Sequence, residues 1–259
     1  MDYINLIKTE LSLDIKKIKS YKVSFLTDIL IFAIVLFSIF ITSLDSAFAD
    51  SYGIDINSGK MIVLIGFIFW QISTTALGWS SANIRGQSVS GTLELKMQSK
   101  YSTELLLFIE MLTYLIISFL SFSVIFLIFI LCIKADTKDI VYILLSYLVA
   151  FPALIGMYGL GLLLGGISLI EKEIGSLVFI LQSVLIFLSD MIEVRSRLFN
   201  IIPFNAGIKI MRQMYLGQNI ESSLIVDYLI SNTVWIILGV ICFRYLLKRV
   251  RTSDSFNNY

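Results

Sequence analysis

Six long runs of apolar residues constrain this chain more than any other feature. They cover residues 23–44, 61–81, 105–133, 140–170, 174–189 and 224–247, each at or near the roughly 20 residues that a helix needs to cross a bilayer. Charged side chains stand mostly between these runs. A helix keeps its backbone polar groups paired internally in lipid. The sequence therefore predicts an all-α polytopic membrane protein, residues 1–259 forming one domain with six transmembrane helices.

Composition agrees with lipid as the solvent and removes several kinds of chemistry. Hydrophobic residues make up 57% of the chain and charged residues 15%, whereas a soluble domain is about one quarter charged. The sequence contains no histidine, which excludes histidine-dependent catalytic triads and histidine metal sites. No catalytic residue, metal site or bound cofactor is predicted on this chain. Cys132 and Cys242 lie in apolar runs far apart and are expected to be buried thiols rather than a disulfide.

The distribution of basic residues orients the spans. If the N-terminus lies inside the cell, the inner segments hold most of the 20 Lys and Arg residues, as the positive-inside rule requires. Both ends of the chain are then cytoplasmic. Pro152 is expected to kink the long fourth span. An alternative at the first span is a signal-peptidase site at residues 47–49, but the preceding apolar run is longer than the 7–15 residues typical of a signal peptide, which favours an uncleaved span.

Two segments outside the spans have the pattern of amphipathic helices. In residues 1–22 an apolar stripe recurs at helical spacing, and such a helix would lie on the cytoplasmic membrane surface. In residues 190–223 a second stripe lies between Pro203, which suits a helix start, and Gly217, which suits a helix stop. This outer helix is expected either to act as a lid or simply to close the outer face. The first stripe consists of Ile4, Ile7, Leu11, Ile15 and Ile18. The second stripe consists of Phe204, Ile208, Met211 and Tyr215.

The third informative segment is the cytoplasmic loop of residues 83–100. Ser90 or Thr92 is placed to cap a short helix, and Glu94 would then lie in its first turn, where a carboxylate stabilises the helix dipole. Leu93 and Met97 are four residues apart and are expected to project together as apolar knobs for a groove on another protein. The alternative is a plain surface connector.

This loop carries a resemblance to a known family. Gly91-Thr92-Leu93-Glu94 resembles the G-T-L-E element of ABC-2 type permeases, the membrane subunits of ABC exporters of drugs, bacteriocins and, in the NatB-like group, sodium. The amphipathic segment before the first span, residues 165–177 and residues 202–217 also resemble the corresponding segments of the family. The resemblance covers nearly the whole chain, and it departs in residues 85–90, where the family often has a more acidic run.

The resemblance implies a bacterial plasma-membrane exporter subunit. It implies a cytoplasmic ABC ATPase as partner, with ATP and Mg²⁺ on that partner, and a second permease, either another copy or a paralogue. The segment from Gly91 to Met97 would be the coupling helix, with further ATPase contacts from the N-terminal helix and from the turn Glu171, Lys172 and Glu173. The chain has no phosphate-binding loop, because its only Gly-Lys pair is followed by Met61.

Inside the predicted spans, ionisable residues are the candidates for a transport pathway. Asp28 and Glu110 lie near the cytoplasmic ends of the first and third spans, and charges in lipid usually mark pathways or partners. Gly161 and Gly165 permit close helix packing, most simply within the subunit. Membrane lipid is an expected partner and nucleic acid is not. The functional alternatives are a scaffold, an immunity component or a passive channel. A membrane enzyme is disfavoured, because the sequence has no pair of intramembrane acidic residues at helical spacing that could act together in catalysis.

Overall fold

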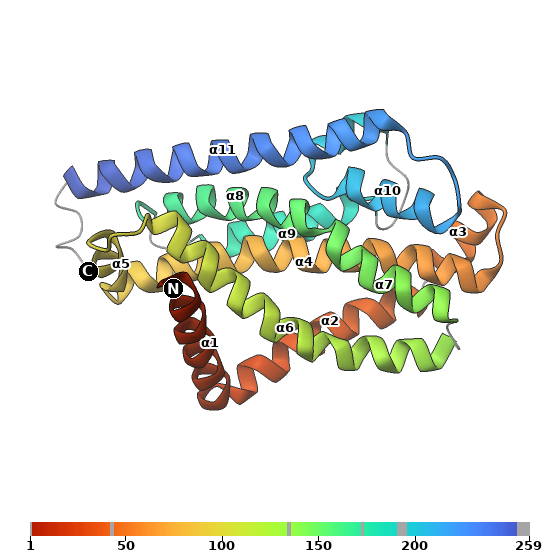
Figure 1. Cartoon of the computed structure of the whole chain (residues 1–259), viewed down its shortest axis with the longest axis horizontal. Helices are drawn as coiled ribbons and strands as arrows, with labels where there is room; N and C mark the ends of the chain where they lie inside the picture. Colours follow the sequence, from red (N-terminus) through yellow and green to blue (C-terminus); the bar gives the residue numbers. More distant parts are fainter. Residues whose placement is uncertain (1, 42–43, 134–135, 172–173, 191–195, 253–259) are drawn as a thin grey trace.

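The computed structural model describes residues 2–41, 44–133, 136–171, 174–190 and 196–252, and within these ranges all regular structure is helical. Figure 1 shows the helices lying largely side by side. Their bounds are α1 Asp2–Ser20, α2 Lys22–Ile41, α3 Leu44–Tyr52, α4 Ile56–Val89, α5 Thr92–Met97, α6 Thr103–Ile133, α7 Thr137–Val149, α8 Phe151–Ser168, α9 Gly175–Leu188, the 3₁₀ helix η1 Arg197–Ile201, α10 Asn205–Tyr215 and α11 Ser222–Thr252.

The long helices run back and forth between two ends of the molecule (Figure 1). One end holds α5, the start of α6 and the last turns of α8 and α11, and is called the α5 end. The opposite end holds α3, α10 and the start of α7, and is called the α10 end. The segments predicted to be cytoplasmic, residues 83–100 and the end of α11, therefore share one end.

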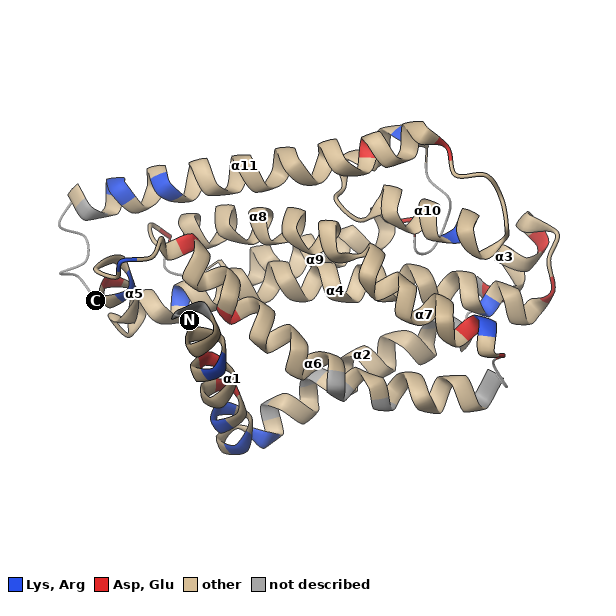
Figure 2. Ribbon diagram, viewed as in Figure 1, with Lys and Arg blue, Asp and Glu red and all other residues tan. Residues whose placement is uncertain are grey.

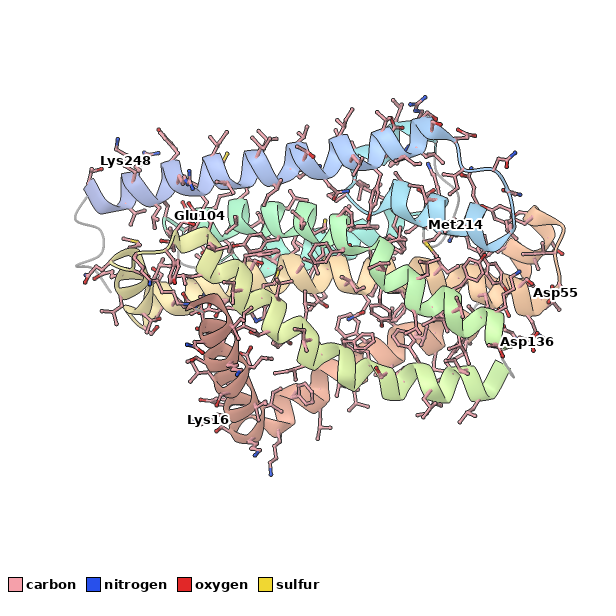
Figure 3. The ribbon with its side chains drawn as sticks, viewed as in Figure 1. Lys16, Asp55, Glu104, Asp136, Met214 and Lys248 are labelled. Carbon is pink, nitrogen blue, oxygen red and sulfur yellow. The ribbon has the colours of Figure 1, made fainter. Side chains whose placement is uncertain are left out.

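Charged side chains gather at these two ends and along α1, and the middle of the helices is almost free of them (Figure 2). Figure 3 places Glu104 and Lys248 at the α5 end and Asp55 and Asp136 at the α10 end. An apolar band between two charged margins is the pattern that a bilayer imposes on helices that cross it.

Three helical stretches among the described residues are long and apolar enough to span a membrane: Ile56–Val89, Phe151–Ser168 and Ser222–Val250. A bent pair, Ile4–Ser20 with Phe25–Ser38, would make a fourth if it counted as one span, and Gly175–Leu188 is a shorter apolar helix. The structure therefore supports a helical membrane protein, but it does not confirm six transmembrane helices. A bend of 91° separates α1 from α2, and the location of α1 on the membrane surface stays a prediction.

The helices extend one predicted span and divide another. Helix α4 continues to Val89, beyond the predicted end of the second span at residue 81, since no proline interrupts it. The predicted kink at Pro152 is confirmed, because the stretch of the fourth predicted span is two helices, α7 and α8, that meet at Ala150. Pro152 explains this break because it has no N–H to donate to the carbonyl of Leu148.

The segment considered as a signal-peptidase site lies inside α3. Phe48 and Ala49 are both buried there, at 4% and 3% exposed. The uncleaved first span stays a prediction.

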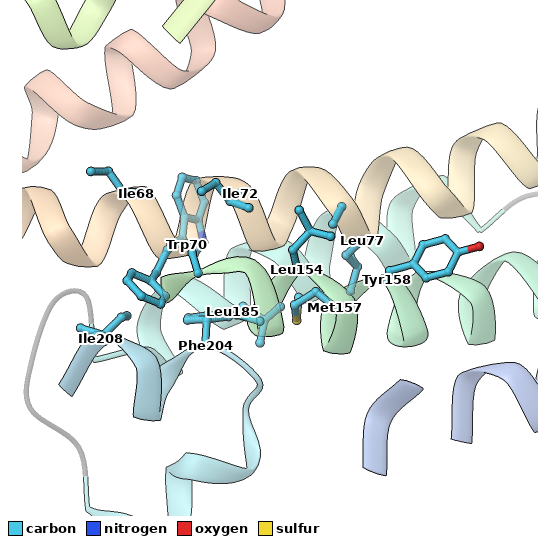
Figure 4. Packing of buried hydrophobic residues seen from close by; sticks show 14 of the residues in the cluster. Ile68, Trp70, Ile72, Leu77, Leu154, Met157, Tyr158, Leu185, Phe204 and Ile208 are labelled. Carbon is cyan, nitrogen blue, oxygen red and sulfur yellow. The ribbon is translucent and has the colours of Figure 1, made fainter. Parts of the chain in front are cut away.

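Helix α4 forms the centre of the core and packs on α8, which packs in turn on α11. Figure 4 shows Leu77 of α4 near Leu154 and Met157 of α8, with Phe204 at the start of α10 in the same cluster. Glycines allow the two close contacts of α8. A Cβ at Gly161 would lie 2.7 Å from Cβ of Ser80 in α4, and one at Gly159 would lie 2.6 Å from Cα of Ile236 in α11. The predicted close packing at Gly161 and Gly165 is thus within the subunit.

The α8–α11 contact predicts a glycine-specific loss of stability. Gly159→Ala places its methyl against α11 backbone, and such overpacking is expected to lower the free energy of unfolding by about 1–3 kcal/mol. The matched control is Gly86→Ala, because Gly86 is also helical but has nothing within 4 Å of its added Cβ; it should be stabilising by about 0.5–1 kcal/mol. Thermal unfolding midpoints in detergent measure both, and equal shifts would contradict the packing described here.

Candidate functional site

Helix α5 begins at a glycine that its backbone requires. Gly91 is the N-cap residue with φ +71°, in the left-handed region, where a side chain is strained. No side chain caps the helix, so the predicted cap at Ser90 or Thr92 is wrong; their hydroxyls hydrogen-bond to each other instead, at 2.9 Å. Glu94 lies in the first turn, as predicted.

Leu93 and Met97 of α5 face the protein rather than solvent. Leu93 is 0% exposed and belongs to the main core, and Met97 packs half-buried against it. The prediction that these two side chains project as knobs is therefore wrong, because α5 lies against α4 and α6 instead of standing free. The side chain of Leu95 is 67% exposed, and with the exposed Thr92 and Glu94 it forms the outward face of α5.

A buried carboxylate connects α5 to the long helices. Oε1 of Glu110 in α6 pairs with Nζ of Lys96 in α5. Its Oε2 accepts hydrogen bonds from Nδ2 of Asn83 at 2.9 Å and from Nε2 of Gln87 at 2.8 Å, both on α4. Glu110 is only 9% exposed, so these donors replace the water that a carboxylate needs. Glu110 thus holds three helices together.

Helix α1 reaches the same place through acidic side chains. Oγ1 of Thr113 in α6 donates to Oδ2 of Asp14 at 2.7 Å, and Asp14 is 5% exposed. Burial lowers the pKa of Lys96 to about 8, against the opposing attraction of Glu10 and Asp14. Seven residues from four helices thus form one polar cluster, called here the junction: Glu10, Asp14, Asn83, Gln87, Lys96, Glu110 and Thr113.

The apolar stripe of α1 is only partly covered. Ile4, Ile7 and Ile15 of the predicted stripe are 61%, 39% and 47% exposed, whereas Leu11 and Ile18 are half-buried. Ile7 and Asp14 are seven residues apart and therefore share a helix face, so α1 contacts the protein along one edge of the stripe and leaves the other edge exposed.

A large cleft opens between α2, α4, α6 and α9 in the apolar band. Its volume is about 680 Å³, within the size range of small-molecule sites. Trp79 and Tyr114 stack in its wall with ring centroids 6.0 Å apart, and Nε2 of Gln182 donates to the carbonyl of Thr74 at 2.8 Å. We call it the membrane cleft; it is lined by Phe25, Ile29, Ile31, Phe32, Val35, Trp70, Thr74, Thr75, Gly78, Trp79, Ala82, Tyr114, Ser118, Phe122, Phe179, Gln182, Ser183 and Ile186.

The lining of the membrane cleft suits an uncharged, amphipathic molecule. None of the described lining residues is charged. Nε1 of Trp70 and Oγ1 of Thr75 are buried and have no hydrogen-bond partner among the described residues. A buried polar group without a partner is costly, so these two atoms offer binding energy to a polar group on a ligand.

Two predicted pathway residues have different outcomes. Glu110 lies in the junction and does not line the membrane cleft. The backbone of Asp28 belongs to α2, but its side chain lies outside the described part. In the predicted third contact with the ATPase, Glu171 is exposed at the α5 end, and Lys172 and Glu173 lie outside the described residues.

The amphipathic helix predicted in residues 190–223 is present as α10. All four residues of its predicted stripe are buried, and Gly217 ends the segment with φ +68°. Arg212 on the same helix is 2% exposed, with its guanidinium carbon 4.5 Å from the ring centroid of Phe48. Helix α10 therefore packs into the α10 end of the molecule, mainly against α4 and α11, and its role as a lid or as closure of that face stays a prediction.

Part of the junction could have been read from spacing. Asn83 and Gln87 are four residues apart, as are Glu10 and Asp14, so each pair lies on one helix face. That these faces meet at Glu110 depends on the fold. The membrane cleft had no sequence signal, since its residues resemble any others that face a core or lipid.

Comparison with known proteins does not identify the chain: no protein-family model matches it, and no match is found among curated proteins.

The junction predicts a charge-dependent stability. Glu110→Gln keeps the volume but leaves one acceptor oxygen for three donors, so at least one buried donor loses its partner. The expected loss is about 1–3 kcal/mol of unfolding free energy. Glu94→Gln on exposed α5 surface is the control and should change stability by less than about 0.5 kcal/mol. Thermal unfolding in detergent measures the stability of both variants. If Glu110→Gln left the unfolding midpoint unchanged, the junction would not hold α5 in place.

Proposed function

We propose that the chain is the permease subunit of an ATP-driven exporter of the ABC-2 type, with ATP hydrolysed by a separate cytoplasmic ATPase. The observation that carries this proposal is the position of α5. It presents a small exposed face at one end of the molecule and is anchored by a buried ion pair to helices that line the membrane cleft. A scaffold needs no such connection.

The proposed topology has six spans: α2, α4, α6, α7 with α8, α9, and α11. The α5 end is cytoplasmic and carries Lys96, Arg244 and Lys248, in line with the positive-inside rule. Helix α9 has 14 residues and covers only about 21 Å, so its crossing requires flanking residues or local thinning of the bilayer. The location is the bacterial plasma membrane.

Two rows of side chains run from the junction to the membrane cleft. On α4, Gln87 and Asn83 hydrogen-bond to Glu110, and Trp79 and Thr75 continue the same i, i+4 row into the cleft. On α6 the corresponding row is Glu110, Tyr114, Ser118 and Phe122, the last three of which line the cleft. Rows spaced by four form the ridges along which helices pack. A displacement of α5 would thus act on both walls of the cleft.

The proposed cycle uses this connection. ATP binding draws the two ATPase subunits together, α5 moves with them, and the permease and its partner permease exchange an inward-open for an outward-open arrangement. The shift is driven by the difference in ATP affinity between the two states. The cleft would hold an uncharged or amphipathic portion of the exported molecule. The partner permease is a second copy of this chain or a related subunit.

The exposed face of α5 predicts where the ATPase binds. Leu95→Asp places a charge in the proposed contact and is expected to reduce the retained ATPase activity about tenfold or more, as loss of a central apolar anchor does. The measurement is ATP hydrolysis by the complex purified from native membranes through a tag on the full chain.

The control is Leu198→Asp, the same substitution at a site 85% exposed near the α10 end. It should leave ATP hydrolysis unchanged. Absence of ATPase activity in the wild-type complex, or equal loss in both variants, would reject the permease assignment in favour of a scaffold or channel.

A further inference from the structure

A second pocket lies on the other side of α6 from the membrane cleft, between α4, α6 and the α7–α8 break. Its volume is about 430 Å³, and Ser118 and Phe122 belong to the walls of both cavities. Ile116 and Phe151 are 52% and 47% exposed, so the mouth opens sideways, where the bilayer lies. We call it the lateral pocket; it is lined by Gln71, Ile72, Leu112, Leu115, Ile116, Ser118, Phe119, Phe122, Tyr147, Phe151 and Leu154.

Two polar groups in this pocket have no partner. Oε1 of Gln71, a residue 1% exposed, and the hydroxyl of Tyr147 are both buried without a hydrogen bond among the described residues. They come from different helices, α4 and α7, yet line the same cavity. A buried amide oxygen without a hydrogen-bond partner costs stability, so a purely structural role does not account for the Oε1 atom of Gln71.

The chemistry of the lining selects the ligand. Most of the wall is aliphatic or aromatic, and none of the described lining residues carries a charge, so a charged head group would find no counter-charge. A hydroxyl suits either unpartnered group, because it can donate to the amide oxygen of Gln71 or accept from the Tyr147 hydroxyl. We infer that the lateral pocket binds a neutral amphiphile with a hydroxyl head and a hydrocarbon body, entering from the bilayer.

The place of this site gives it a regulatory consequence. Phe151 follows Ala150, where α7 gives way to α8, and Ser118 and Phe122 are shared with the membrane cleft. An occupant therefore contacts both the helix break and the wall between the two cavities. This inference does not rest on the transport proposal and holds for a channel or scaffold equally.

The test uses two matched photoreactive probes, a diazirine-bearing octanol and the same diazirine octane without the hydroxyl. Each is added to the purified full-length chain in lipid nanodiscs, and the modified residues are located by mass spectrometry. The octanol should label the segments around residues 112–122 and 147–154 about five- to tenfold more efficiently than the octane, the advantage of one to two net hydrogen bonds.

Tyr147→Phe and Gln71→Leu should each remove most of this preference. Gln71→Leu should also raise the thermal midpoint of the ligand-free chain, because it removes an unpaired buried amide; a glutamine that only supports the fold would lower it. Thr75→Val, which removes an orphan hydroxyl from the membrane cleft instead, is the control and should keep the preference.

Competition separates the two sources of such a ligand. Displacement of the octanol by diacylglycerol in the nanodisc identifies a bilayer lipid, and displacement only by added free alcohols identifies a molecule from outside the membrane. Equal labelling by the two probes, labelling outside these segments, or a preference unchanged in both Tyr147→Phe and Gln71→Leu would overturn the inference.

Discussion

The burial of α4 is the constraint on which the rest of this structure depends. Its 34 residues pair their backbone groups internally, and its apolar stretch is almost wholly enclosed by other helices. Every functional feature is built against it: α8 packs on one face, α5 turns back on its last turn, and both cavities open beside its middle. Because α4 has neighbours on all sides, a displacement of one of its ends would also displace helices that have no contact with each other.

The same helix carries polar groups that a merely structural helix would not retain. Trp70, Gln71, Ser73 and Thr75 lie within six residues of each other in the apolar band, and each has a buried polar atom without a partner among the described residues. In contrast, the buried carboxylate of Glu110 is fully engaged. Paired and unpaired buried polar groups therefore have different roles in this structure. The junction holds helices together, whereas the middle of α4 offers unused hydrogen-bonding capacity to whatever enters the cavities.

The amphipathic segments show why sequence patterns succeed or fail. In α10 the stripe of Phe204, Ile208, Met211 and Tyr215 is long enough to define a face, and the structure buries all four residues. In α5 the pattern was only two residues, Leu93 and Met97, and a pair cannot say whether it faces its own protein or a partner. The structure turns it inward, because α4 and α6 provide an apolar surface within reach, and leaves Leu95 outside.

By itself, the sequence determined the class of this protein. Long apolar runs and few charges indicate a helical membrane protein, since lipid supplies no partners for an open backbone, and Pro152 and Gly217 mark where helices break and end. The role of Gly91 at the start of α5 was seen only in the structure. Only the tertiary structure decided which polar residues meet. Glu10, Asn83, Lys96 and Glu110 are spread over a hundred residues, and their contact arises because helices stack by side-chain shape and burial, which no local pattern encodes. The cavities arise in the same way, from the spaces that packing leaves between helices.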